Sequence, residues 1–217
     1  MEFIKILAIE TASDICGIAY VKNGNCEGLI EKSIPRKHAE QLPLFYQKLI
    51  KKTGLKLSEL DGIAISIGPG SFTGLRIGLS YGKGLAYSHG LSIIPVPTLK
   101  SLAYSYGQFE GTIRVLLHSH REIFFQQDFV CGIDGLEVLT EKQVTEWLQI
   151  KNNFEGIDSI LYYGGDSFLA KLDMVKIVKI YPSSEWIGKL AEQNFADWNM
   201  DNPFELVPDY TAPFLSN

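Results

Sequence analysis

The residues best placed to do chemistry lie in a glycine-rich stretch. Gly68-Pro-Gly-Ser-Phe-Thr73 follows a predicted strand at Gly62–Ile67 and opens a predicted helix at Gly74–His89. Backbone N–H groups at a helix start attract anions. The stretch is not a P-loop, because Leu75-Arg76 stands where Lys and Ser or Thr are required, and it lacks the third glycine of a dinucleotide fingerprint. It predicts either a phosphate or partner contact, or only a tight turn with a helix cap. The residues available for a loop contact are Gly68, Gly70, Ser71, Thr73 and Arg76.

The helix that follows carries small residues at four-residue steps. Gly74, Gly78, Gly82 and Ala86 fall on one helical face. Each interior glycine costs about 1 kcal/mol relative to alanine, so three cost about 3 kcal/mol, a large part of a domain's net stability. Two kinds of contact would offset this cost: close packing against the chain's own sheet, or close approach of another subunit's helix.

The histidines do not form a recognisable metal site. Two imidazoles at positions i and i+4 of a helix can share a metal ion, but His38 is followed at the fourth position by Leu42. His118 and His120 lie two apart in a predicted turn, with no obvious third ligand nearby. We therefore expect no bound metal and no cofactor. A serine nucleophile is also not indicated, because the chain has no GxSxG elbow.

One acidic group keeps a nucleotide-dependent alternative open. The polar turn Glu10-Thr-Ala-Ser-Asp14 separates two predicted strands, and in an ATP-binding kinase an acid at such a turn lies near the γ-phosphate. Gly164-Gly165-Asp166 is the only candidate for a second phosphate loop, and it also reads as an ordinary turn. Autonomous phosphotransfer or ATP hydrolysis is thus the alternative function, beside a homodimeric binding module.

Length and composition limit the class of protein. The chain has 217 residues, 46% apolar and 21% charged, which suits one domain or two small lobes. The net charge is −5 and no block of Lys and Arg stands out, so direct nucleic-acid binding receives little support and any role with RNA would run through a partner. Three cysteines without CxxC spacing indicate a reducing cytoplasm. The short apolar run after the N-terminus predicts no signal peptide and no membrane span.

A strand, a polar turn and a return strand occur twice, about 110 residues apart, at Ile4–Lys22 and Ile113–Val130. The first copy continues through the hairpin signal Asn23-Gly24, a third strand, and an amphipathic helix at His38–Lys52. This organisation predicts an α/β, actin/Hsp70-like two-lobe fold of the ribonuclease H-like type, each lobe a mixed sheet with helices. We expect an N-terminal lobe at 1–108 and a smaller, degenerate lobe at 109–217. A further helix is expected at Ser184–Asn194.

Three of these segments together resemble the TsaB (YeaZ) family: Glu10-Thr-Ala-Ser13, His38-Ala-Glu-Gln-Leu42 and the stretch from Gly68 to Gly78. The resemblance implies a cytoplasmic, non-catalytic subunit that supports a TsaD-type catalytic subunit together with a TsaE-type ATPase. The assembly transfers threonylcarbamoyl to adenosine 37 of tRNAs that read ANN codons, and this chain would reach tRNA only indirectly. Docking, or homodimerisation through the same face, would use Leu42, Phe45, Tyr46, Leu49, Gly74, Gly78, Gly82 and Ala86.

The chain departs from the family pattern at three places. Glu10 stands where the first turn usually has Asp, and His118-Ser-His-Arg121 replaces an Asp-Ala-Arg-Arg-like turn. A C-terminal Pro-x-Tyr-Leu-Arg pattern is reduced to Pro208-Asp-Tyr-Thr211. These changes put a family role of the second-lobe surface in question and leave the fold prediction unaffected.

Overall fold

The computed structural model describes residues 4–107, 109–133, 135–170, 172–173, 175–200 and 203–211. The chain divides into two compact units that are not consecutive in sequence. Unit 1 comprises Met1–Thr98 and Pro182–Asp209, and unit 2 comprises Leu99–Tyr181 and Tyr210–Asn217. Residues 182–209, expected in the second lobe, therefore belong with the first sheet.

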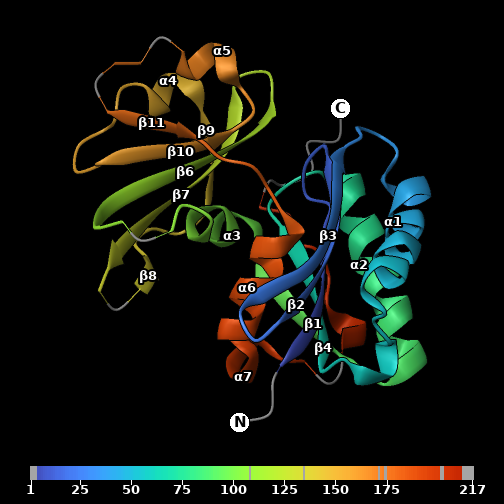
Figure 1. Cartoon of the computed structure of the whole chain (residues 1–217). Helices are drawn as coiled ribbons and strands as arrows, with labels where there is room; N and C mark the ends of the chain where they lie inside the picture. Colours follow the sequence, from blue (N-terminus) through green and yellow to red (C-terminus); the bar gives the residue numbers. More distant parts are fainter. Residues whose placement is uncertain are drawn as a thin grey trace. The chain divides into compact units, whose positions relative to one another are not determined.

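Unit 1 is a five-stranded mixed sheet with helices on both faces (Figure 1). The strand order is β3-β2-β1-β4-β5; β1 pairs antiparallel with β2 and parallel with β4. Helices α1 and α2 pack on one face and α6 packs on the other. The elements are β1 Lys5–Glu10, β2 Ile15–Lys22, β3 Asn25–Ser33, α1 His38–Thr53, a 3-10 turn Leu57–Glu59, β4 Gly62–Gly68, α2 Phe72–His89, β5 Ser92–Pro97, α6 Ser184–Gln193, α7 Phe195–Trp198 and a 3-10 turn Pro203–Glu205.

The alternation of side chains along β1 explains the three layers of unit 1. Leu7 and Ile9 point into the core under α1 and α2, where they meet Leu42 and Leu79. Ala8 points to the opposite face, where α6 approaches so closely that a Cβ on Gly188 would lie 3.1 Å from the Ala8 Cβ. Both faces of β1 are thus covered, as the near-continuous apolar run of this strand requires.

Unit 2 is a second mixed sheet, in the order β11-β10-β6-β7-β8, with β9 also paired to β7. One face packs on α3 through Leu99 and Leu102, and the other packs on α4 and α5 through Ile150 and Leu169. The elements are α3 Thr98–Tyr104, β6 Gly111–His120, β7 Ile123–Gly132, β8 Gly135–Val138, β9 Gln143–Glu146, α4 Trp147–Ile150, β10 Ser159–Tyr163, α5 Asp166–Leu169 and β11 Lys176–Lys179.

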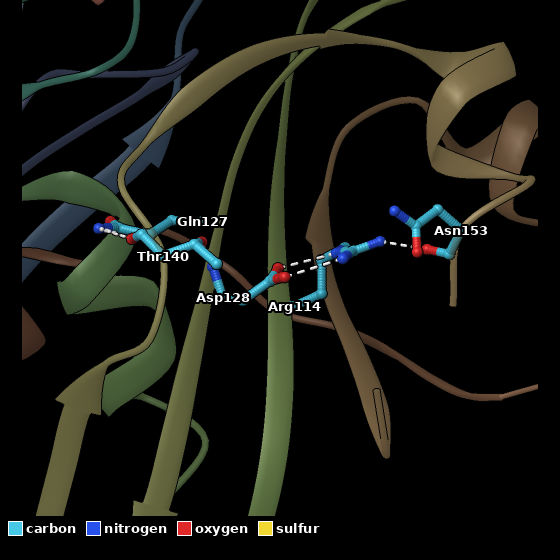
Figure 2. A network of polar contacts seen from close by, with 5 residues as sticks. All are labelled: Arg114, Gln127, Asp128, Thr140 and Asn153. Atoms are coloured by element: carbon cyan, nitrogen blue, oxygen red, sulfur yellow. Dashed lines mark hydrogen bonds and ion pairs between the residues drawn. The ribbon is translucent and has the colours of Figure 1, made fainter. Parts of the chain in front are cut away.

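A buried ion pair crosses the centre of this second sheet (Figure 2). Arg114 on β6 and Asp128 on β7 are register partners, and both nitrogens of a guanidinium fork lie 2.8 Å from the carboxylate oxygens. The Arg114 guanidinium also donates to the carbonyl of Asn153 at 2.5 Å. The backbone carbonyl of Asp128 accepts the N–H groups of Leu139 and Thr140 after β8, and the Asp128 N–H donates to the Thr140 hydroxyl. The ion pair joins the two central strands; the Arg114 side chain ties β6 to Asn153, and the Asp128 backbone ties β7 to the segment after β8.

Candidate functional site at the first hairpin and the start of α2

The glycine-rich loop and the first hairpin lie together at one end of the unit 1 sheet. The N–H of Ser71 donates to the carbonyl of Ala12 at 2.7 Å. The Ser71 hydroxyl accepts the N–H of Gly74 at 3.2 Å, so it caps the N-terminus of α2. Gly70 lies so close to the hairpin that a Cβ there would be 2.3 Å from the Ala12 carbonyl oxygen. The loop is thus both a helix cap and a support for the hairpin.

Glu10 is the acidic group at this end of the sheet, and it is 1% exposed. Its carboxylate accepts the N–H of Ala12 at 2.5 Å and a hydrogen bond from Ser66 on β4. Burial nevertheless raises the pKa of Glu10 from 4.5 to about 7, because removal from water penalises the charged form more than these bonds favour it. At neutral pH this carboxyl is therefore shared between its charged and neutral forms.

A second carboxylate lies on the same face of the sheet. Glu10 is the register partner of Gly17, and Gly17 is the partner of Glu31, so both side chains point toward α6 across a glycine. Ser183, the N-cap residue of α6, donates to Glu31 at 2.9 Å. Burial also raises the pKa of Glu31. Motif analysis missed this neighbour and Ser66, since each comes from a different strand and neither belongs to a local pattern.

The structure corrects the docking role predicted for the glycine stripe of α2. Gly74, Gly78 and Gly82 are buried against the chain's own residues. A Cβ would lie 2.1 Å from the Thr11 carbonyl oxygen at Gly74, and 2.2 Å from the Thr11 hydroxyl at Gly78. At Gly82 it would lie 2.3 Å from a methyl of Ile65. The stripe, with Ala86 at 1% exposure, therefore allows α2 to pack closely on its own sheet.

The predicted interface residues of α1 are mostly core as well. Leu42 and Leu49 are fully buried and Phe45 is 5% exposed, all three in the cluster between α1, α2 and the sheet. Tyr46 alone is half-buried, and its ring packs edge-on against Tyr81 of α2 at 6.1 Å. The amphipathic pattern thus marked the inward face of α1, and a partner can reach only the outward face of the helix pair.

The loop residues divide into a structural and an accessible set. Gly68 has φ of 120° and is buried, with its N–H donated to the Thr98 hydroxyl at 3.1 Å. Ser71, Thr73 and Arg76 are exposed, and the Arg76 guanidinium lies 3.8 Å from the ring centre of Phe72. Any contact made by this loop would therefore use the exposed side of the first turn of α2.

The remaining polar candidates have structural positions. His38 is 5% exposed, and its Nε2 lies 3.3 Å from the Ile15 carbonyl. Gly165, at φ of 70°, precedes the short helix α5, whose first residue Asp166 pairs with Lys179. His118 contacts the Arg121 carbonyl through Nε2 at 2.9 Å. Within the described residues, no group of three His, Cys, Asp or Glu side chains is arranged to hold a metal ion.

Both units have the mixed sheets and flanking helices of the actin-like α/β proteins, and comparison with known proteins supports this class. The structure matches YeaZ from Pseudomonas aeruginosa with a TM-score of 0.82 at 21% identity, over 95% of this chain and 99% of that one. Component A of the (R)-2-hydroxyglutaryl-CoA dehydratase of Acidaminococcus fermentans matches at 0.55, with 8% identity, over 89% and 100%. The predicted fold class is confirmed.

The sequence is related to two groups of curated proteins. The family model of TsaD, tRNA N6-adenosine threonylcarbamoyltransferase, matches residues 18–123. The tRNA threonylcarbamoyladenosine biosynthesis protein TsaB of Escherichia coli (strain K12) is 35% identical over 52% of this chain and 48% of its own length. TsaB of Haemophilus influenzae is 28% identical over 58% and 55%, so the chain spans about half the length of these relatives. TsaB of Bacillus subtilis is 26% identical over 87% and 82%. The resemblance to the TsaB (YeaZ) family is confirmed.

Proposed function

We propose that this chain is a non-catalytic partner subunit that activates a TsaD-type enzyme in the synthesis of threonylcarbamoyladenosine at position 37 of tRNAs reading ANN codons. A TsaE-type ATPase would complete the assembly. The proposal is supported by the TsaB relatives, by the shared fold, and by the burial of His38 and Leu42 on helix α1.

The environment of His38 is the single observation that carries the non-catalytic part of the proposal. The imidazole is enclosed between α1 and β2, with its Nε2 at the Ile15 carbonyl. Leu42, one turn later on the same face, is a fully buried core residue. A metal ion needs two or more accessible side-chain ligands. Positions 38 and 42 of α1 are both buried in packing contacts, so this helix face has no accessible ligand pair.

Glu10 argues against autonomous nucleotide chemistry. A carboxyl that holds Mg²⁺ beside a phosphate must be charged and open to the ion. Glu10 is almost fully buried, takes hydrogen bonds from its own hairpin and from Ser66, and has a pKa of about 7. Its position favours a role in holding the hairpin at the start of α2.

The outward face of α1 and α2 is the proposed docking surface for the TsaD-type subunit, or for a second copy of this chain. Tyr46 and Tyr81 are half-buried there. Ser80 and Gly84, one turn apart on α2, are exposed, and a Cβ added at Gly84 would meet nothing within 4 Å. A tyrosine pair beside small residues offers area and close approach to a partner helix.

The proposal is tested by co-expressing this chain with the TsaD-type subunit of its own organism and measuring association by light scattering. We expect a defined complex with the wild type and a loss of association of at least tenfold with Ser80→Arg. Ser167→Arg, an exposed serine of unit 2, is the matched control and should associate normally.

The two alternatives give different results in the same experiment. Absence of any complex, together with tight ATP binding by the isolated chain in calorimetry, would establish the phosphotransferase alternative. Association of the chain only with itself, increasing with concentration in sedimentation, would establish a homodimeric binding module.

No helix in the described parts of the chain is long and apolar enough to cross a membrane.

A further inference from the structure

Helix α1 and the segments beside it hold an unusual concentration of positive charge. Between residues 32 and 56 there are seven cations and one acid, Glu40, a net charge of +6 in a chain whose total is −5. The rest of the chain therefore carries −11. All seven cations are exposed. They are Lys32, Arg36, Lys37, Lys48, Lys51, Lys52 and Lys56.

Four of these cations form a stripe along one side of α1. Lys37, the N-cap residue, and Lys48 are eleven positions apart, which is close to three turns of 3.6 residues. Lys51 and Lys52 lie three and four positions after Lys48, so they share its face. We call these four residues the basic stripe. It extends over fifteen residue steps, about 22 Å at 1.5 Å per residue.

The edge of the sheet extends the basic stripe. Lys32 on β3 is the register partner of Cys16, and Cys16 belongs to the core cluster beneath α1. Partners on adjacent strands point to the same face, so Lys32 points to the α1 side of the sheet. Because β3 is the outermost strand, Lys32 adds its charge at the side of α1 that is away from α2.

Within the described residues, the four lysines of the basic stripe have no carboxylate at ion-pair distance. Lys48 lies 5.8 Å from the ring centre of Phe45, and Lys56 is 3.6 Å from Glu59. A row of uncompensated cations raises the local potential and attracts a polyanion of similar length.

We propose that the basic stripe and Lys32 bind the phosphate backbone of RNA, so that this subunit itself contacts the tRNA of the proposed function. The inference rests on that function for the identity of the RNA, and it replaces the expectation of indirect contact. Successive phosphates of a nucleic-acid strand are repeating single charges. Lys48, Lys51 and Lys52 lie within about one turn of α1 and Lys37 lies three turns earlier, so they can contact such phosphates without reading sequence.

The form of α1 favours RNA over a membrane surface. A helix that lies on a bilayer must insert its apolar face, but the apolar face of α1 is committed to the core through Leu42, Phe45 and Leu49. Leu44 is the only large apolar side chain that α1 exposes substantially. The basic stripe also lies on the side of α1 opposite Tyr46, so RNA and a partner subunit can bind to the helix pair at the same time.

The test measures tRNA binding by the full-length chain and by its complex with the TsaD-type subunit, using fluorescence anisotropy between 50 and 200 mM salt. The variant is Lys51→Gln with Lys52→Gln. The control with equal charge change is Lys151→Gln with Lys176→Gln, two exposed lysines of unit 2. Losing two phosphate contacts should weaken binding on the order of tenfold per lysine and lower the salt slope by about two. The control should resemble the wild type.

Three outcomes would overturn the proposal. In the first, the wild-type chain does not bind tRNA at 50 mM salt and the variant complex binds it as the wild-type complex does. In the second, the two double variants weaken tRNA binding equally; in the third, the stripe variant weakens binding only to phosphatidylglycerol vesicles and not to tRNA. The last would assign the stripe to anionic lipid. Complex formation is scored in the same samples by light scattering, so failure of the RNA contact is distinguished from failure of the proposed partner role. Melting temperatures measured by circular dichroism establish that both variants remain folded.

Discussion

The Thr11 hydroxyl oxygen lies 2.2 Å from the position that a Cβ would take on Gly78. This distance is shorter than any real contact of a methyl group, so Gly78→Ala must displace either the hairpin or α2. We expect a loss of about 1–3 kcal/mol in the free energy of unfolding, as for other overpacked cores. Urea denaturation followed by circular dichroism measures it. Gly78→Arg should prevent folding, and a folded, soluble Gly78→Arg monomer would contradict the inward packing of this face.

Alanine at Gly84, six positions later on the same helix, should change the free energy of unfolding in the opposite direction. Gly84 is exposed, and an added Cβ meets nothing within 4 Å. Gly84→Ala should therefore stabilise the isolated chain by about 0.5–1 kcal/mol, because alanine restricts the unfolded backbone and favours the helix. The same denaturation experiment serves as the control for Gly78→Ala. If the proposed docking surface is used, Gly84→Ala also weakens association with the TsaD-type subunit.

Glu10 makes stability depend on pH in a direction unusual for a carboxylate. Its pKa is raised from 4.5 to about 7 in the folded state, so between these values the folded chain binds more protons than the unfolded chain. Its contribution is fully present below pH 4.5 and is lost as the pH rises to 7. The change corresponds to about 3 kcal/mol. Burial raises the pKa of Glu31 too, which acts in the same direction.

The measurement is the free energy of unfolding of wild type and Glu10→Gln at half-unit steps from pH 4.5 to 8. The amide of glutamine keeps the size of the side chain and has no charge to bury. We expect the variant to lose most of the decline that the wild type shows between pH 5 and 7. Parallel curves for the two proteins would show that another group is responsible.

Much of unit 1 could be predicted from the sequence, because its elements carry strong local signals. The strand Ile15–Lys22 and the start of α1 at His38 were predicted with the bounds that the structure shows. Asn23-Gly24 does form the turn between β2 and β3. The helix at Ser184 was predicted as well, but its place on the first sheet was not, because local periodicity does not say which of two sheets a helix will cover.

The strands β8 and β9 of unit 2 were not predicted. β8 and β9 have four residues each, and they expose Val138 and Val144, so they lack the alternation that identifies a half-buried strand. The same limit applies to the candidate site. The glycine stripe could be recognised as costly, but only the structure shows that it faces Thr11 and Ile65. The excess of Lys and Arg between residues 32 and 56 can be read from the sequence, but only the structure shows that the lysines of the basic stripe are exposed on one helix.

The Arg114–Asp128 pair gives the final prediction, for unit 2. Both side chains are less than a tenth exposed, and the carboxylate receives two guanidinium bonds of 2.8 Å (Figure 2). Asp128→Asn leaves a buried guanidinium without its countercharge and should cost about 3–5 kcal/mol. Arg114→Met combined with Asp128→Leu removes both charges and should cost much less than the single change. A double-mutant cycle by denaturant unfolding compares them. If the single and double variants were equally destabilised, the loss would come from packing, and the charge pair would not be the reason that these two strands stay joined.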